Sequence, residues 1–463
     1  MKKRLISLLC AATTLLSLCT ACLTGCGKNE EKEVVTTPLL RIGILSDIHV
    51  SESVWGDRQH DRFEKALRFF KEKGVDGVLI AGDLQENTDY EVASYNIEEV
   101  VDIWFKVFPD NKNDLTGERV EPLFIYGNHD IGLVDAQYWP DRLGEYEDAW
   151  IKEIKGYQFV GAHYTKEGTD EVAKLVSRAE AKSDDKPFFF IQHQPIVDTV
   201  FDADEGLRGT GVPMYDVLKK MENCVVFSGH THIPITNERS IWQSNSKKGA
   251  RFTAINCATI NYGWIKGLGM DINGNADSTQ QGMYMVVDGS TVTLERYSFY
   301  DMELYYEGDT VSVKVEEAES IGADWVFDVN ETKKRTYDYD TRQQKAEQPV
   351  FAEDAVLEVA SVGKTYVNLL VPPATVGAPE GFSDLVYCYY AEAVDPESGE
   401  VVAHSMAATE HHIDIDVSRL QNEVFIGLEG LEPGHTYTIN VYARECYDKD
   451  SEPLTAEITT PLE

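Results

Sequence analysis

Cysteine is scarce in this chain, which has eight in 463 residues. Four of them lie in the first 26 residues, and among the four that follow no two stand in a CxxC spacing. Thiols that are so few and so widely spaced exclude a small disulfide-held scaffold. Cys388 and Cys446 share the last part of the chain, and the sequence leaves open whether these two form a disulfide.

Positive charge is also in short supply, with 42 Lys and Arg against 79 Asp and Glu and a formal net charge of -37. Such a surface repels polyanions, so we expect no nucleic-acid partner. The 43% hydrophobic and 26% charged residues are ordinary for globular proteins and exclude whole-chain disorder, collagen and a membrane protein with many spans. At ~100–200 residues per domain, the length predicts two or three domains.

The N-terminus has the pattern of an export signal. Three basic residues at positions 2–4 precede an apolar run, which ends in Leu23–Cys26. A basic start, a short apolar segment and small residues before a break are typical of secretory signals. The ending resembles the bacterial lipoprotein box, which implies that residues 1–26 are a signal peptide and that Cys26 is lipidated. We therefore expect an extracytoplasmic protein with a lipid anchor in the cell membrane and a tether over residues 27–38. An uncleaved membrane anchor is the alternative.

Further along, five short apolar runs each end in polar residues. They are Leu39–Leu45 with Asp47 and His49, Val78–Ala81 with Asp83, Leu123–Tyr126 with Asn128, His129 and Asp130, Phe188–Ile191 with His193, and Cys224–Phe227 with His230 and His232. Runs of this length predict buried strands. An apolar face over residues 63–70 predicts an intervening helix. Alternating strands and helices indicate an α/β domain, in which ligands gather at the carboxyl ends of the strands.

The glycines at the strand ends are part of this pattern. Gly82, Gly127 and Gly229 stand directly before Asp83, Asn128 and His230. Glycine adopts backbone conformations that other residues resist. We therefore expect unusual backbone geometry where the polar groups begin.

Seven strand-end residues are candidate metal ligands: Asp47, His49, Asp83, Asn128, His193, His230 and His232. Imidazoles, carboxylates and one amide suit Zn, Mn or Fe better than Ca or a thiolate-bound metal. Seven ligands are too many for one tetrahedral ion, and they suit two ions that share a carboxylate. Such a pair, ~3.5–4 Å apart, can clamp the attacking and leaving oxygens of an in-line displacement. A single Asp or His at a strand end is more often structural. The prediction of a metal site therefore rests on the occurrence of all five groups of polar residues together.

The series DxH, GD, GNHD, H and GHTH across residues 47–232 resembles the calcineurin-like metallophosphoesterase family. The resemblance implies a four-layer α-β-β-α sandwich, and weaker likeness extends this domain over residues 39–330. It implies that Asp47, His49 and His232 bind one metal, that Asn128, His193 and His230 bind a second, and that Asp83 bridges both. It also implies a phosphoric-ester hydrolase whose nucleophile is a hydroxide between two divalent or trivalent transition-metal ions.

The same resemblance implies a catalytic role for His129, which is not a ligand. His129 would stabilise the transition state or protonate the leaving oxygen, with Asp130 as its orienting partner. Purple acid phosphatases carry a tyrosine three residues after the GD aspartate, where this chain has Glu86, so that branch is disfavoured. Candidates for the pocket wall, with core or loop packing as the alternative, are Asn261, Tyr262 and Trp264.

The end of the chain has a different pattern. Residues 331–350 are polar and are expected to be a linker that lies against the first domain. Short alternating strands over residues 351–463 predict a β-sandwich. The clearest are Thr365–Val371, Asp384–Val394, Val401–Ala407 and Thr436–Ala443. Leu431–Tyr437 resembles the tyrosine corner of fibronectin type III domains, which implies a hydrogen bond from Tyr437 back to the chain. A different β-sandwich is the alternative.

The charge of this last segment suggests what it does not bind. Residues 351–463 contain four Lys and Arg against 21 Asp and Glu. Such a surface should not hold anionic polymers. We expect a spacer or a module that contacts protein or the cell surface.

Together these features predict a membrane-anchored, metal-dependent phosphoesterase that hydrolyses a phosphate mono- or diester. Its expected partners are a small phosphorylated substrate and the membrane. A pyrophosphate-cleaving hydrolase of the same family is one alternative, and a non-catalytic binding lipoprotein on a phosphoesterase scaffold is another. The ligand set does not choose the substrate or the metal.

Overall fold

The computed structural model describes residues 39–51, 56–87, 89–130, 138–163, 169–203, 211–246, 249–263, 279–300, 302, 304–307, 310–313, 318–377, 385–409 and 423–462. The expected signal peptide with Cys26, the tether and Trp264 lie outside these residues. Within the described ranges, no helix is both long enough and apolar enough to cross a membrane.

The first of two large sheets has the strand order β14-β11-β10-β1-β2-β3, with β15 also paired to β11. Its strands are β1 (Leu40–Leu45), β2 (Gly77–Ile80), β3 (Glu121–Phe124), β10 (Gln281–Asp288), β11 (Thr291–Ser298), β14 (Glu319–Ser320) and β15 (Trp325–Asp328). Strands β1, β2 and β3 are parallel, and β10 pairs antiparallel with β1. The carboxyl ends of the three parallel strands therefore meet at one edge of the sheet.

The second sheet has the order β4-β5-β6-β7-β9-β8. Its strands are β4 (Ala149–Ile154), β5 (Tyr157–Ala162), β6 (Phe188–Ile191), β7 (Cys224–Ser228), β8 (Ile241–Trp242) and β9 (Thr253–Asn256). Strands β5, β6, β7 and β9 are parallel, whereas β4 and β8 pair antiparallel at the two edges. All five strands predicted from the sequence are present, with ends shifted by at most two residues, and they divide between the two sheets.

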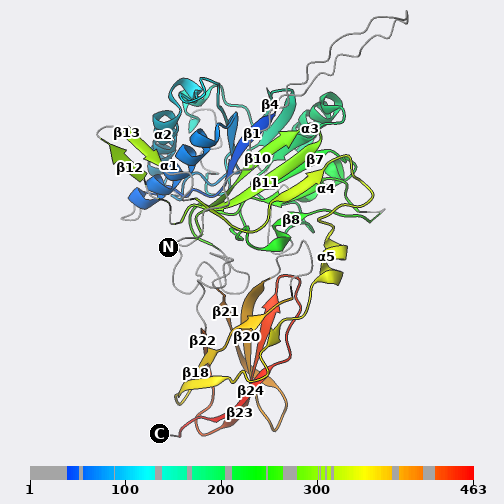
Figure 1. Ribbon diagram of the computed structural model, residues 1–463. Helices are drawn as coiled ribbons and strands as arrows, with labels where there is room; N and C mark the ends of the chain where they lie inside the picture. Colours follow the sequence, from blue (N-terminus) through cyan, green and yellow to red (C-terminus); the bar gives the residue numbers. More distant parts are fainter. Residues whose placement is uncertain are drawn as a thin grey trace, which may run out of the picture. The chain divides into compact units, whose positions relative to one another are not determined.

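Helices cover the outer face of each sheet (Figure 1). They are α1 (Gly56–Lys73) and α2 (Tyr90–Val107) on the first sheet, and α3 (Thr169–Ser183) and α4 (Gly211–Leu218) on the second. Leu79 of β2 packs with Phe189 of β6 in the core between the sheets, whereas Val78 and Ile80 pack under α1 and α2. A third cluster lies between the second sheet and its helices. These layers confirm the expected α-β-β-α sandwich.

Helix α1 shows how closely the layers pack. Its predicted apolar face, Phe63, Ala66, Leu67 and Phe70, is fully buried. A Cβ atom at Gly43 in β1 would lie 2.5 Å from the Phe70 ring, so only glycine lets the helix approach this strand. Helix α2 begins at an Asp89 cap, whose carboxylate accepts from the backbone N–H groups of residues 91 and 92.

The polar segment after residue 330 packs against the α/β sandwich. Arg335 and Tyr337 are buried, and α5 (Tyr339–Lys345) carries the buried Arg342. Arg342 forms an ion pair with one carboxylate oxygen of Glu238, which lies in the short helix η5 (Glu238–Ser240). The other carboxylate oxygen of Glu238 lies 3.4 Å from the guanidinium group of Arg296 in β11. Two guanidinium groups thus compensate one buried carboxylate.

The C-terminal region is a β-sandwich of two antiparallel sheets. One has the order β17-β18-β22, with β17 (Glu358–Val362), β18 (Tyr366–Val371) and β22 (Val424–Glu429). The other has the order β21-β20-β23-β24, with β20 (Val386–Val394), β21 (Val401–Ala408), β23 (Thr436–Glu445) and β24 (Leu454–Thr459). Strands β16 (Val350–Phe351) and β19 (Ala374–Thr375) form a separate two-stranded sheet in this region. Another two-stranded sheet, β12 (Leu304–Glu307) with β13 (Thr310–Val313), precedes it in the chain. An apolar cluster fills the space between the two larger sheets.

Two predictions about side chains of this region can be compared with the structure. The hydroxyl of Tyr437, at the start of β23, accepts a hydrogen bond of 2.9 Å from the backbone N–H of Glu432, which is the contact that a tyrosine corner requires. Cys388 and Cys446 are buried free thiols, so they do not form the disulfide that the sequence left open.

Candidate metal centre

The candidate ligands come from the carboxyl ends of strands in both sheets. Asp47 and His49 follow β1, Asp83 follows β2, and Asn128 follows β3 of the first sheet. The second sheet contributes His193 after β6, and His230 and His232 after β7. Because the sheets pack face to face with these ends together, six of the seven side chains gather in two adjoining clusters that share Asp83. The seventh, Asn128, contacts His193 of the second cluster.

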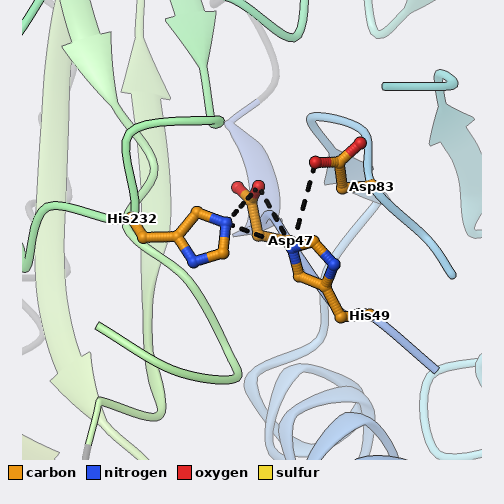
Figure 2. A group of neighbouring side chains, drawn as sticks. All are labelled: Asp47, His49, Asp83 and His232. Atoms are coloured by element: carbon orange, nitrogen blue, oxygen red, sulfur yellow. Dashed lines mark hydrogen bonds and ion pairs between the residues drawn. The ribbon is translucent and has the colours of Figure 1, made fainter. Parts of the chain in front are cut away.

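Asp47, His49, Asp83 and His232 form the first cluster (Figure 2). His232 Nε2 lies 3.0 Å from Asp47 Oδ1 and 3.1 Å from His49 Nε2. His49 Nε2 is 3.7 Å from Asp47 Oδ1 and 3.9 Å from Asp83 Oδ2. The ring nitrogens and carboxylate oxygens thus point at one small volume.

Asp83 also belongs to the second cluster, with His193 and His230. Its Oδ2 atom lies 3.0 Å from His193 Nε2, which in turn is 2.9 Å from Asn128 Oδ1. The rings of His193 and His230 meet edge to face, with their centroids 5.1 Å apart. The same carboxylate oxygen therefore faces ligand atoms of both clusters, which is the position expected of a bridging residue.

Backbone carbonyls orient two of the histidines. His193 Nδ1 donates to the carbonyl oxygen of Ala81 at 2.7 Å, and His232 Nδ1 donates to that of Tyr262 at 2.9 Å. Because a carbonyl only accepts, Nδ1 must carry the proton, which leaves Nε2 free to bind a metal. These contacts hold both rings in the orientation and tautomer that a ligand needs.

The backbone is strained where the ligands begin. Asp47, His49, Asp83, His230 and His232 all have φ between 52° and 70°. Non-glycine residues rarely adopt this left-handed region, and the conformation persists only where surrounding contacts enforce it. One such contact is the hydrogen bond of 3.0 Å from Asp47 N to the carbonyl oxygen of Gly82.

The strand-end glycines serve two different needs. Gly82 has φ of 96°, so the expected unusual conformation is present there. Gly127 and Gly229 are not among the glycines with positive φ. At these two positions glycine is required because a side chain would collide with neighbouring carboxylates. A Cβ atom at Gly127 would lie 2.2 Å from Asp83 Oδ1, and one at Gly229 would lie 2.3 Å from Asp47 Oδ2. Our conformational explanation was therefore wrong for these two glycines.

Buried charges dominate the electrostatics of the site. Burial opposes ionisation of Asp47 and Asp83, but the charges of neighbouring histidines hold both pKa values below the usual range. Burial likewise opposes a charge on His49 and His193, yet contacts with the carboxylates raise their pKa values to about 10 and about 9. His230 differs, since burial and the nearby His193 lower its pKa to about 4.

These residues fit a pair of metal ions. The Nε2 atoms of His49 and His232 face one another at 3.1 Å, an arrangement in which two lone pairs repel unless a cation or a proton lies between them. The carboxylates of Asp47 and Asp83 are buried beside them and need positive charge. Imidazole, carboxylate and amide donors suit Zn, Mn or Fe, and the donor set does not select one of them.

His129 lies beside this site, with about a third of its side chain exposed. Its Nδ1 is 3.3 Å from a carboxylate oxygen of Glu86, and the same carboxylate contacts His49 Nδ1. Glu86 thus touches both a candidate ligand and the candidate catalytic histidine. The sequence marks Glu86 only as a departure from the tyrosine of purple acid phosphatases. Its position three residues after Asp83 is the sequence feature that could have predicted a place in the site.

Asp130 lies elsewhere than we expected. Its carboxylate accepts hydrogen bonds from the backbone N–H groups of Leu84, Gln85 and Gly127, at 3.1, 3.2 and 2.8 Å. Burial and the charge of Asp83 raise its pKa to about 7. Asp130 therefore holds together the loops after β2 and β3. The carboxylates beside the His129 ring are those of Glu86, at 3.3 Å from Nδ1, and Asp83, at 4.0 Å from Nε2.

Two candidates for the pocket wall fall in the described residues. The Tyr262 ring packs on His232 and His49, with centroid distances of 4.4 and 5.3 Å, so it does line the first cluster. Asn261 instead accepts a hydrogen bond of 2.7 Å from the buried guanidinium of Arg62. Tyr262 is thus a wall residue, whereas Asn261 joins the loop to α1.

A comparison with protein-family models matches residues 40–234 to calcineurin-like phosphoesterases. This segment belongs to the calcineurin-like phosphoesterase family. The matched residues include all seven candidate ligands, and the Asp and His clusters suggest two metal ions. The metallophosphoesterase domain makes the chain a hydrolase of phosphoric esters, as we predicted.

The solved structures that match parts of this chain are distant from it in sequence. One is a dimetal phosphatase from Danio rerio, at 10% identity over 56% of this chain and 95% of that one, with a TM-score of 0.39. A purple acid phosphatase from yellow lupin (Lupinus luteus) seeds shares 13% identity over 63% of this chain and 54% of that one, with a TM-score of 0.37. The FN5 domain of Drosophila Lar matches 25% of this chain with 97% of its own, at 14% identity and a TM-score of 0.16. No curated protein matches.

Proposed function

We propose that this metallophosphoesterase hydrolyses a phosphate mono- or diester outside the cytoplasm, where a lipidated Cys26 holds it on a membrane. The hydrolytic part is supported by Asp83, whose Oδ2 atom lies 3.0 Å from His193 Nε2 and 3.9 Å from His49 Nε2. One carboxylate can thus serve two metal ions. The location is supported by the sequence pattern of residues 1–26.

The chain's own residues prepare the site. Two bound metal ions would supply positive charge to the phosphoryl oxygens and a water of lowered pKa. Asp47, His49 and His232 would hold one ion, Asn128, His193 and His230 the other, and Asp83 both. The carbonyl groups that orient His193 and His232 reduce the cost of assembling this set.

His129 is the residue placed to move a proton. It is more exposed than the buried histidines of the first cluster, so its ring can reach a substrate. A carboxylate oxygen of Glu86 lies 3.3 Å from His129 Nδ1, where its negative charge stabilises the imidazolium form. His129 Nε2 then donates its proton to the leaving oxygen as the phosphoester bond breaks.

The deciding assay measures hydrolysis of p-nitrophenyl phosphate and bis-p-nitrophenyl phosphate by the protein loaded with Mn, Fe or Zn. Metal content is determined on the same samples. We expect turnover only in the loaded samples, and the ratio of the two rates assigns monoester or diester preference. Two bound ions without turnover of either substrate would contradict the proposal.

The membrane location has its own test. Mass spectrometry of the protein expressed in a bacterial host should find an acylated N-terminus at Cys26. Cys26→Ala should abolish the acylation and release the protein from the membrane fraction. An unmodified cysteine in the membrane fraction would indicate the uncleaved anchor instead.

A further inference from the structure

A cavity of about 310 Å³ lies where the edge strands β3 and β4 of the two sheets approach one another. None of the seven candidate metal ligands lines it. Its walls combine aromatic rings with carboxylates, namely Phe124, Trp139, Trp150, His163, Glu145 and Glu147. The volume is at the lower end of the range for small-molecule sites, ~300–1,000 Å³, so a compact ligand is required.

The aromatic wall is held in place by contacts around His163. The Trp139 ring meets His163 edge to face at 5.1 Å, and Tyr146 stacks on His163 at 5.2 Å. Trp150 donates from Nε1 to the carbonyl oxygen of Phe124 at 3.2 Å, and its ring lies directly over Gly161, where a Cβ would collide with it. The wall is thus assembled by contacts within the protein before any ligand binds.

His163 contributes a neutral ring. Its Nδ1 accepts a hydrogen bond of 2.9 Å from the backbone N–H of Tyr126, so Nε2 carries the proton. Burial lowers the pKa of His163 to about 3. No positive charge from this ring therefore opposes a cation in the cavity.

The charged residues of the lining leave a negative excess. Lys152 is the cation among the described lining residues, and its Nζ is already paired with Glu121 at 2.9 Å and lies 5.3 Å from the Trp150 ring centroid. Glu145 and Glu147 are exposed at the cavity and form no ion pair with a described residue. Two carboxylates therefore remain available to a ligand.

We propose that this cavity binds a small organic cation, an ammonium group with methyl or methylene substituents. Aromatic faces attract such a group through the negative charge above the ring, by ~0.5–2 kcal/mol for each good contact. Glu145 and Glu147 add Coulombic attraction, and they repel anions, so the phosphorylated substrate is excluded here. The site is independent of the hydrolytic function and stands whether or not the metal centre is active.

The test is calorimetric titration of the full chain with choline and with 3,3-dimethylbutan-1-ol, its neutral counterpart of the same shape. We expect choline to bind and the neutral alcohol to bind more weakly by ~2- to 30-fold, the range of one cation–π contact. A soluble short-chain phosphatidylcholine distinguishes the source of the ammonium group. Competition with choline would indicate a lipid headgroup, and its absence a free ammonium compound.

Variants locate the binding in the cavity. Trp139→Leu and Glu147→Gln should each weaken choline binding by several-fold, and Glu147→Gln keeps the test valid if the tryptophan variant unfolds. Matched controls from the C-terminal sandwich, Tyr366→Leu and Glu397→Gln, should bind choline as the unmodified chain does. Asp83→Ala should also bind choline normally, which separates this site from the metal centre. Equal binding of choline and the alcohol, or equal weakening in the control variants, would overturn the proposal.

Discussion

The α/β sandwich and the C-terminal β-sandwich each bury carboxylates, but they treat them differently. Glu445 is fully buried in the β-sandwich, and its two oxygens accept backbone N–H groups of Tyr447 and Lys449, both at 2.7 Å. Asp83 is equally buried, yet only its Oδ1 accepts a backbone N–H, that of His129, at 2.8 Å. Its Oδ2 faces imidazole nitrogens instead. Backbone donors thus hold both oxygens of Glu445, whereas Asp83 Oδ2 is directed at imidazole nitrogens of the candidate ligands.

Backbone strain follows the same division. Among the described residues, the non-glycine positions with positive φ include five candidate ligands of the α/β sandwich, but only Asp448 in the β-sandwich. Such conformations cost ~1–3 kcal/mol each, and folds retain them where function needs them. The difference teaches that the α/β sandwich gives up stability at its candidate metal centre, while the β-sandwich has one such position among its described residues.

The largest effect should come from Asp83→Ala, compared with Glu445→Ala. Loss of a residue that hydrogen-bonds to a metal ligand lowers the affinity for the metal by ~10–100-fold. Loss of a ligand shared by two ions should therefore lower the metal affinity by more than ~100-fold. Asp83→Ala should lose bound metal and turnover together, as measured by elemental analysis and the nitrophenyl assay. Glu445→Ala should lower the melting temperature and leave metal content unchanged. Equal metal loss in both variants would remove the distinction between the two carboxylates.

His129→Ala should have the next largest effect. Loss of a general acid lowers turnover by ~10²–10⁴-fold, and His129 is not one of the candidate ligands. We expect metal content to stay at the level of the unmodified protein while kcat falls. A substrate whose leaving group needs no protonation should be affected least. Loss of metal in this variant would make His129 a ligand and overturn its assigned role.

Glu86→Gln should lower activity by ~10–100-fold, because the carboxylate contacts both His49 and His129. The amide cannot stabilise a positive charge on the neighbouring His129 ring, so the basic limb of the activity's pH profile, where a general acid loses its proton, should move to lower pH. Glu91→Gln, an exposed position in the first turn of α2, is the matched control. An unchanged pH profile in Glu86→Gln would reduce Glu86 to a packing residue.

The smallest effect concerns the β-sandwich. Tyr437→Phe removes the hydroxyl that accepts the backbone N–H of Glu432, and a hydrogen bond of this kind contributes ~0.5–1.5 kcal/mol to stability. Chemical denaturation should show a loss of about 1 kcal/mol, with turnover and metal content unchanged. A fall in turnover at full metal occupancy would show that this sandwich takes part in catalysis.

Much of the fold could be predicted because its signals are local. The strand-end residues Asp47, Asp83, His193 and His232 stand within five residues after short apolar runs, and each run is a strand in the structure. Tyr437 likewise follows a local pattern of turn residues. Such features depend on neighbours in the chain, so the sequence alone contains them.

Other features could not be predicted because they depend on distant segments. Glu86 reaches His129 only because β2 and β3 are adjacent parallel strands. Asp130 adjoins His129 in the sequence, but backbone N–H groups after β2 bind its carboxylate. Neighbours in sequence can point to opposite sides of a loop, so adjacency did not predict the partner of His129.

The sequence by itself determined which residue types stand at the ends of which strands, and therefore the chemistry that the domain can perform. The tertiary structure decided that Asp83 Oδ2 faces both histidine clusters, that Gly127 and Gly229 must leave room for carboxylates, and that a cavity opens between two sheet edges. The physical reason is the separation of the interacting residues along the chain. Strand formation depends on residues that are neighbours in sequence, whereas the distance between two charged side chains depends on how the two sheets pack.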